Sequence, residues 1–240
     1  MTLAVSIIAK DGIILASDSR MGSTLYSNDT VDKIIQLSDH IAVGIAGDGT
    51  LASHIFDLVK KEKKLDLDKG ILYVAEQLGQ ELANFFDRYY SNISFRDRDP
   101  LDILLVGYTL FPESKPQIYN LSSSDNFIPR QSPAGHNSIG IPHIANYHLN
   151  RIYEKDRINS EQAAKLSVFC IKETGSQYRS VGGDVKVAIF SDKKKFALIS
   201  KSEMSNLETQ CDLLQKSQKY RFYPEEEGMD DKNNSIIFMK

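Results

Sequence analysis

The sequence predicts an α+β protein in which groups of antiparallel strands are separated by long helices. Val- and Ile-rich segments fill most of residues 3–46 and return from 101 onward, as expected of strands. Between them, 50–64 and 69–90 carry apolar residues at helical spacing. The chain lacks the strict strand–helix alternation that marks a parallel sheet. We therefore expect two sheets with helices outside them.

The first twenty residues predict a hairpin that organises the rest of the chain. Two apolar runs flank Asp11-Gly12, a pair typical of tight hairpin turns in which both central positions need positive φ. Such a hairpin doubles back and brings Asp18 close to Thr2. Threonine at this position becomes N-terminal once Met1 is removed.

The remainder of the chain is interpreted as one continuous domain. The polar, turn-rich segment 21–32 is predicted to be a loop. Strands are expected at 33–37, 41–46, 101–110, 117–121, 126–129, 184–190 and 196–199, and further helices after 142, from 160 and over 202–220. No repeat or linker divides the chain, so residues 1–200 are assigned to the domain. Residues 201–240 are expected to pack on it as a helix with an acidic extension, of which 225–231 is a mobile surface stretch.

Composition excludes several classes of function. Of 240 residues, 41% are hydrophobic and 25% charged, and the net charge of −3 gives no basic face for nucleic acid. Two cysteines, Cys170 and Cys211, form neither a disulfide framework nor a metal-binding spacing, which favours a reducing compartment. No apolar run approaches the roughly 20 residues that span a bilayer. No basic region precedes the first apolar stretch, so we expect no signal peptide. We expect a cytoplasmic protein without a nucleic-acid or membrane partner.

A chain-terminal threonine has the means to act as a nucleophile. Its hydroxyl needs a neighbouring base, and its own α-amine, with a pKa of about 7.7–8.0, is partly neutral at pH 7. A lysine close by, such as Lys33, lowers that pKa further, and Asp18 can pair with the lysine and fix its position. A backbone N–H on the glycine turn at Gly47 can stabilise the oxyanion.

The order Thr2, Asp18, Lys33 and Gly47 resembles the catalytic subunits of the proteasome and of its bacterial relatives, which are N-terminal-nucleophile (Ntn) hydrolases. Ser17-Asp18-Ser19-Arg20 is also close to that family's usual Ala-Asp-Thr-Arg. The resemblance runs from Thr2 to Ile199 and implies a four-layer αββα sandwich. It also implies that Thr2 is the nucleophile, Asp18 and Lys33 its charged partners, and Gly47 the oxyanion donor.

By the same resemblance, the chain cleaves peptide bonds of peptides or unfolded proteins inside a homo-oligomeric ring, without a metal or other cofactor. Five residues are expected to form a pocket for a hydrophobic side chain before the cut: Val31, Ile35, Ile45, Gly49 and Ser53. Two alternatives stay open. One is an Ntn amide hydrolase or transpeptidase with a single narrow substrate, and the other is a non-catalytic structural subunit. The sequence does not indicate the ring size or an ATPase partner.

Three positions depart from the family's pattern. Ile139 stands where the family has a helper serine, and Tyr178 and Val181 replace an acid and a serine that hydrogen-bond around the terminal amine. We expect attack by Thr2 to survive these changes while proton transfer slows. Each candidate also has a structural explanation when taken alone, since Asp18 suits a turn, Lys33 a surface and Gly47 a turn with positive φ.

Overall fold

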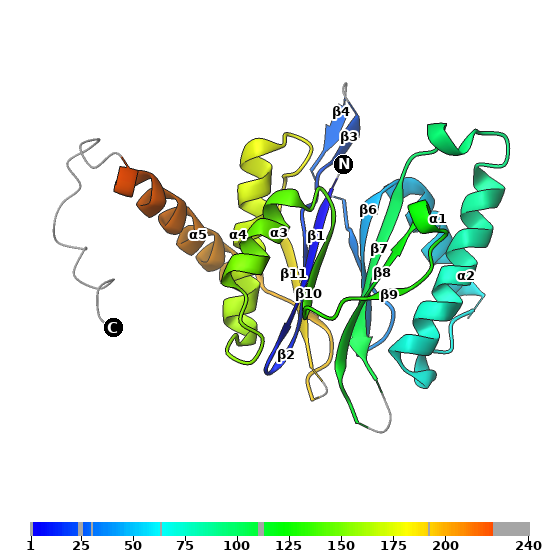
Figure 1. Cartoon of the computed structure of the whole chain (residues 1–240), viewed down its shortest axis with the longest axis horizontal. Helices are drawn as coiled ribbons and strands as arrows, with labels where there is room; N and C mark the ends of the chain where they lie inside the picture. The colour runs from blue at the N-terminus through cyan, green and yellow to red at the C-terminus, as the bar shows by residue number, and fades with distance from the viewer. Residues whose placement is uncertain are drawn as a thin grey trace.

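The structure is a computed structural model that describes residues 2–23, 26–29, 31–62, 64–109, 113–191 and 193–222. Two five-stranded antiparallel sheets face each other between two helical layers (Figure 1). The first sheet has the order β10 (His136–Gly140), β1 (Leu3–Ala9), β2 (Gly12–Ser17), β11 (Lys186–Phe190), β12 (Ala197–Leu198). The second has the order β5 (Ile34–Gln36), β6 (Ile41–Gly47), β7 (Leu101–Tyr108), β8 (Pro116–Ser122), β9 (Arg130–Gln131). The predicted α+β class and the αββα sandwich are confirmed.

Four helices form the outer layers. The second sheet is covered by α1 (Gly49–Lys61) and α2 (Ile71–Tyr89), and the first by α3 (His143–Ile152) and α4 (Ser160–Gln177). Short 3₁₀ turns lie at Leu67–Lys69, Phe95–Asp97 and Ser123–Asp125. Because the first sheet is sandwiched on both faces, every residue of β2 is buried, which explains its continuous apolar run.

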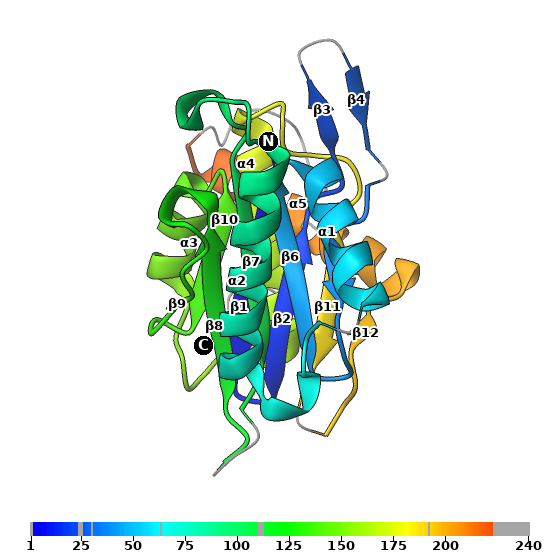
Figure 2. The same cartoon turned by 90° about the vertical axis from the view of Figure 1, so that its right-hand side faces the viewer.

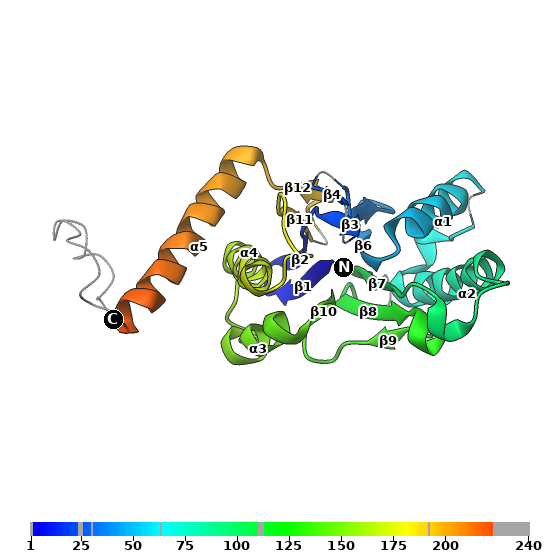
Figure 3. The ribbon, with the colours of Figure 1, turned by 90° about the horizontal axis from the view of Figure 1, so that it is seen from above.

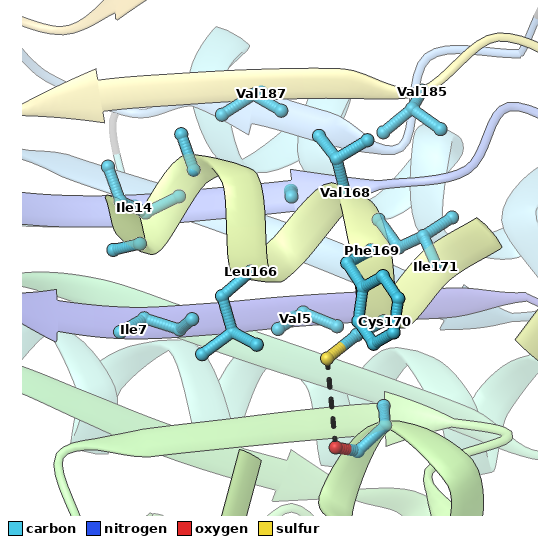
Figure 4. Close-up of a cluster of buried hydrophobic side chains, with 14 of the residues drawn as sticks. Val5, Ile7, Ile14, Leu166, Val168, Phe169, Cys170, Ile171, Val185 and Val187 are labelled. Carbon is cyan, nitrogen blue, oxygen red and sulfur yellow. Dashed lines mark hydrogen bonds between the residues drawn. The ribbon is translucent and has the colours of Figure 1, made fainter. Parts of the chain in front are cut away.

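Three apolar layers hold the sandwich together. In the first, α4 packs over β1 and β2, and Val168 of the helix shares a buried cluster with Val5 and Ile14 of the strands (Figure 4). A second layer joins α1 and α2 to the other sheet. The third fills the space between the sheets, where a Cβ placed on Gly44 would come 3.1 Å from Leu15 Cδ1 and 3.2 Å from Ala4 Cβ. The sheets therefore approach closely at the strands that carry the candidate site.

The last described helix, α5 (Lys201–Phe222), leaves the body of the domain (Figure 3). Its first half packs on α4 through Met204, Leu207 and Cys211. Figure 1 shows the second half extending beyond α4. The acidic segment 225–231 lies outside the described residues. Among the helices that are described, none is long and apolar enough to cross a membrane.

Three local predictions need correction. The first hairpin forms, but Lys10 and Asp11 make its turn, with Ala9 paired to Gly12, and positive φ is not used there. The predicted loop at 21–32 contains a small hairpin of β3 (Met21–Ser23) and β4 (Tyr26–Asn28), which projects from the body (Figure 2). The predicted strand at 126–129 is instead a turn, and β9 follows it.

Candidate active site

Thr2 lies just before β1, where it is only 4% exposed. Its carbonyl oxygen accepts a hydrogen bond from Ile141 N at 3.1 Å. Gly140 makes this approach possible, because its φ is +89° and a Cβ there would lie 1.9 Å from that same oxygen. The backbone of Thr2 is thus fixed from β10, the strand that pairs with β1.

A buried ion pair lies beside Thr2. Lys33 Nζ donates to Asp18 Oδ1 at 2.9 Å, with Asp18 fully buried and the Lys33 side chain 5% exposed. Asp18 Oδ1 also accepts from Leu3 N at 3.0 Å, so the carboxylate is tied to the residue that follows Thr2. Lys33 makes a second hydrogen bond, to the carbonyl oxygen of Arg20. The first hairpin therefore brings Asp18 to the start of the chain, as the sequence predicts.

Burial shifts the proton affinity of the lysine. Removal from water lowers the pKa of Lys33, and the charge and hydrogen bond of Asp18 oppose that effect without cancelling it. An ammonium group with a lowered pKa releases its proton more readily, and while charged it favours neutral amines nearby.

Gly47 ends β6 at the turn into α1. Its φ is +103°, and a Cβ would lie 1.9 Å from the carbonyl oxygen of Pro100, so only glycine fits this backbone. The next residue, Asp48, donates its N–H to the same Pro100 oxygen at 3.0 Å. The turn is therefore held against the start of β7.

These groups meet in a narrow cleft, which we call the Thr2 cleft. Its volume is about 10 Å³, near the minimum that admits one water molecule. It is lined by Thr2, Met21, Val31, Asp32, Lys33, Ile45, Gly47 and Gly49. Three of the five predicted pocket residues, Val31, Ile45 and Gly49, are among them. Ile35 instead packs toward the α1–α2 layer, and Ser53 is exposed on α1. Asp18 lies behind Lys33 rather than on the cleft wall.

A family model for the proteasome subunit matches residues 2–190. The chain belongs to the proteasome subunit family. It is 28% identical to the proteasome subunit beta of Methanopyrus kandleri, over 86% of this chain and 94% of that protein. It is 25% identical to the subunit beta of Methanothermobacter thermautotrophicus, over 85% and 92%. Subunit alpha 1 of Haloferax volcanii is 22% identical over 89% and 82%, so both kinds of proteasome subunit are among its relatives.

Solved structures of Anbu proteins share the fold. Anbu (ancestral beta-subunit) from Yersinia bercovieri superposes with a TM-score of 0.73 at 18% identity, covering 95% of this chain and 99% of that one. An Anbu (Gly-1) mutant from Hyphomicrobium sp. strain MC1 gives a TM-score of 0.72 at 16% identity, over 96% and 100%. The sandwich is therefore the proteasome-type fold over nearly the whole chain.

The three departures from the proteasome pattern do not reach the Thr2 cleft. Ile139 lies in the layer between the sheets, and Val181 is buried in the layer under α4. Tyr178 is 39% exposed at the end of α4. Apolar packing explains the first two, because each fills a core that a serine would leave with an unpaired hydroxyl.

Several residues of the site act through their backbone and escaped the sequence analysis. Gly182 N donates to Asp18 Oδ2 at 3.0 Å, and Gly182 O accepts from Ser19 N and Arg20 N at 3.2 and 2.9 Å. The loop that carries Val181 thus supports Asp18 by main-chain groups. The paired glycines at 182–183 are the signal that could have found it, since a Cβ on Gly183 would come 2.6 Å from Ser19 Oγ.

Met21 was also missed, and it controls the width of the cleft. A Cβ placed on Gly49 would lie 3.2 Å from Met21 Sδ, so the thioether fills the space beside Gly49. The sequence analysis assigned Met21 to a loop, and only its position directly after the Ser17–Arg20 motif could have indicated its role.

Proposed function

We propose that the chain is a threonine peptidase subunit with Thr2 as its N-terminal nucleophile. The observation that carries this proposal is the buried Asp18–Lys33 ion pair, hydrogen-bonded to Leu3 N and lying beside the cleft that Thr2 shares with Gly47. A buried lysine and carboxylate are costly to keep in a purely structural role. Perturbed charged groups next to a nucleophile are typical of catalytic sites.

Catalysis would begin once Met1 is removed and Thr2 has a free α-amine. The amine takes the hydroxyl proton while Oγ1 attacks the carbonyl carbon of the scissile peptide bond. The resulting oxyanion is stabilised by the Gly47 N–H. Collapse breaks the C–N bond, and the leaving amine takes the proton from the α-ammonium. The α-amine of Thr2 then deprotonates a water molecule, which attacks the carbonyl carbon of the Thr2 ester. As the bond from that carbon to Oγ1 breaks, the α-ammonium returns the proton to Oγ1, and the new carboxylic acid is released.

The lining of the Thr2 cleft suggests the preferred substrate. The apolar side chains of Val31 and Ile45 support the expectation from the sequence that the residue before the scissile bond is hydrophobic. The volume of about 10 Å³, with Met21 beside Gly49, supports a small side chain such as alanine rather than a large hydrophobic one. Peptides or unfolded proteins are the proposed substrates.

Assembly into a homo-oligomeric ring is part of the proposal. Membership of the proteasome subunit family supports it. The loop that follows α2 also exposes large apolar side chains, with Ile93 and Phe95 each at least 43% accessible. A cytoplasmic location fits the two free cysteines, Cys170 and Cys211.

Two other functions have an observation in their favour. Relatives that are proteasome alpha subunits, together with Ile139, Tyr178 and Val181 in place of polar residues, favour a non-catalytic structural subunit. The small cleft volume favours an Ntn amide hydrolase or transpeptidase with one narrow substrate. A structural subunit does not explain the buried ion pair beside Thr2 as well as a peptidase does. A narrow amide hydrolase or transpeptidase would use the ion pair in the same way as the peptidase.

Peptide hydrolysis by matched threonine variants tests the proposal. Wild-type protein should cleave fluorogenic peptides with alanine before the cut, and Thr2→Ala should abolish cleavage. Thr209→Ala, a change at an exposed threonine on α5, should leave the rate unchanged. Cleavage of a single amide and of no mixed peptide would favour the narrow hydrolase. An assembled protein without any turnover would favour the structural subunit.

A further inference from the structure

We propose that Tyr90 is a positioning residue that fixes the Gly47 turn through the carboxylate of Asp48. Tyr90 directly follows α2 as its C-cap residue, 42 residues from Asp48 along the chain, and its hydroxyl donates to Asp48 Oδ2 at 2.9 Å. The proposal rests on the proposed function, because the turn matters for chemistry only if Gly47 stabilises an oxyanion. It adds a residue from a helix that contributes nothing to the Thr2 cleft itself.

Asp48 is the point at which the turn is anchored. Its Oδ1 accepts from Thr50 N at 3.1 Å and Leu51 N at 3.0 Å, which caps the first turn of α1. Its own N–H donates to the Pro100 oxygen at 3.0 Å. The side chain therefore has one oxygen on the helix and one on Tyr90. Rotation of this carboxylate would break the cap on the first turn of α1, which begins directly after the Gly47–Asp48 peptide.

The burial and packing of the Tyr90 side chain fix its hydroxyl in place to donate to that carboxylate. Its ring is 4% exposed and packs against Phe86 with ring centroids 4.8 Å apart. Burial raises the pKa of the Tyr90 hydroxyl, and the hydrogen bond and charge of Asp48 raise it further. The hydroxyl therefore stays protonated over the working pH range and remains a donor to Asp48.

The arrangement also solves an electrostatic problem. A carboxylate one residue from Gly47 would repel the negative charge that develops on the substrate oxygen. Three donors, two amides at the positive end of α1 and the Tyr90 hydroxyl, compensate that charge and hold it away from the cleft. Without the phenol, the Oδ2 atom would lose this partner, and the two amides bonded to Oδ1 would hold the carboxylate less firmly.

Tyr90→Phe tests this with the neighbouring tyrosine as control. The substitution keeps the buried ring and removes only the hydroxyl, whereas Tyr89→Phe removes a hydroxyl from a residue that is 57% exposed. The probe is a peptide epoxyketone, which bonds to both the hydroxyl and the free amine of an N-terminal threonine. Tyr90→Phe should lower the maximal labelling rate of Thr2 by about tenfold, with the half-saturating probe concentration unchanged. Tyr89→Phe should leave both values at the wild-type level.

A double-mutant cycle separates positioning from a general loss of stability. Asp48→Asn removes the charge that Tyr90 compensates, so adding Tyr90→Phe to it should change the labelling rate by less than about twofold. Equal losses from Tyr90→Phe in both backgrounds would overturn the proposal, as would equal effects of Tyr90→Phe and Tyr89→Phe.

Hydrogen exchange distinguishes a wrong positioning role from a wrong function. If wild-type Thr2 is not labelled at all, the proposed function fails. The effect of the Tyr90–Asp48 hydrogen bond on the Gly47 turn can still be measured by hydrogen exchange. Amides of segment 45–51 should then exchange about tenfold faster in Tyr90→Phe than in wild type, and at the wild-type rate in Tyr89→Phe. Unchanged exchange in Tyr90→Phe would show that Asp48 does not need the phenol.

Discussion

Lys33 Nζ lies 2.9 Å from Asp18 Oδ1, and both side chains are almost completely removed from water. Two buried charges gain from each other only while both are present, because either one alone keeps its desolvation cost without a partner. Breaking the pair should therefore destabilise the fold as well as remove the candidate charge system beside Thr2.

Replacement of Lys33 should affect both properties. Among the described residues, Lys33→Ala leaves buried Asp18 with only the backbone N–H groups of Leu3 and Gly182 as partners, so we expect a loss of about 3 kcal/mol in unfolding free energy. Thr2 labelling should fall about a hundredfold or more. Urea unfolding and epoxyketone labelling measure the two effects. Lys195→Ala, which breaks an exposed ion pair with Asp39, should change neither, and a Lys33→Ala protein that labels normally would place the activity elsewhere.

Met21→Ala should widen the Thr2 cleft. Loss of the thioether beside Gly49 makes room for a larger side chain before the cut. The ratio of kcat/KM for leucine over alanine substrates should rise about tenfold, the scale of a few methylene groups in an apolar pocket. A ratio that stays at the wild-type value would show that Met21 does not limit the pocket.

Two glycines with positive φ, one at the end of β10 and one just before its start, offer a matched comparison. Gly140 and Gly135 have φ of +89° and +77°, and a Cβ on either would collide, with Thr2 O at 1.9 Å and with Tyr153 Oη at 2.3 Å. Both Gly→Ala changes should lower the melting temperature. Only Gly140→Ala should also slow Thr2 labelling in the folded protein, because only that collision moves Thr2. Equal labelling of the two variants would contradict the positioning of Thr2 by β10.

The Arg20–Asp29 pair should make stability depend on pH. Hydrogen bonds from Arg20 Nε and Nη2, each 2.7 Å, lower the pKa of Asp29 on folding. A carboxylate with a lowered folded-state pKa contributes stability above its unfolded-state pKa of about 3.9 and loses it as the pH falls through the folded-state value. The melting-temperature difference between wild type and Asp29→Asn should thus be present at pH 7 and shrink below about pH 4. A difference that is the same at both pH values would contradict this.

Local sequence signals predicted the framework of the site but not its details. The hairpin that carries Asp18 and the strand pair that carries Lys33 follow from apolar runs and turns. The turn at 126–127 does not, because Asn126 and Phe127 both have positive φ. Phe127 tolerates that conformation since its ring is buried against Phe86 and its carbonyl approaches Gly79. These tertiary contacts offset the conformational cost of positive φ at Phe127, and local sequence does not reveal them.

The same limit applies to the cleft. The family resemblance places Ile35 and Ser53 in the cleft. In the structure, Ile35 packs toward the α1–α2 layer and Ser53 is exposed on α1. Gly140 and Gly182 support the site through main-chain atoms, which a pattern of side chains does not reveal. Tyr90 meets Asp48 only because α2 returns to the start of α1.

Val181 and Tyr178, which stand where the family has a serine and an acid, can be replaced by the family residues to test whether those groups would assist Thr2. Val181 is 1% exposed within the apolar layer under α4, so Val181→Ser should lower the unfolding free energy by about 1–3 kcal/mol and add no activity. Tyr178→Asp, at an exposed position, should be nearly neutral. Faster peptide cleavage by Val181→Ser would show that the family serine can still reach the Thr2 amine.

The most direct test of a nucleophilic Thr2 is the intact mass of wild-type protein after reaction with a peptide epoxyketone. Our account predicts a chain that lacks Met1 and carries one probe, with fragmentation placing the adduct on Thr2. Because the probe must bond to both the hydroxyl and the α-amine, this single species tests removal of Met1 and reactivity of Thr2 together. A protein that keeps Met1, or that lacks it and remains unmodified at saturating probe, would contradict the account.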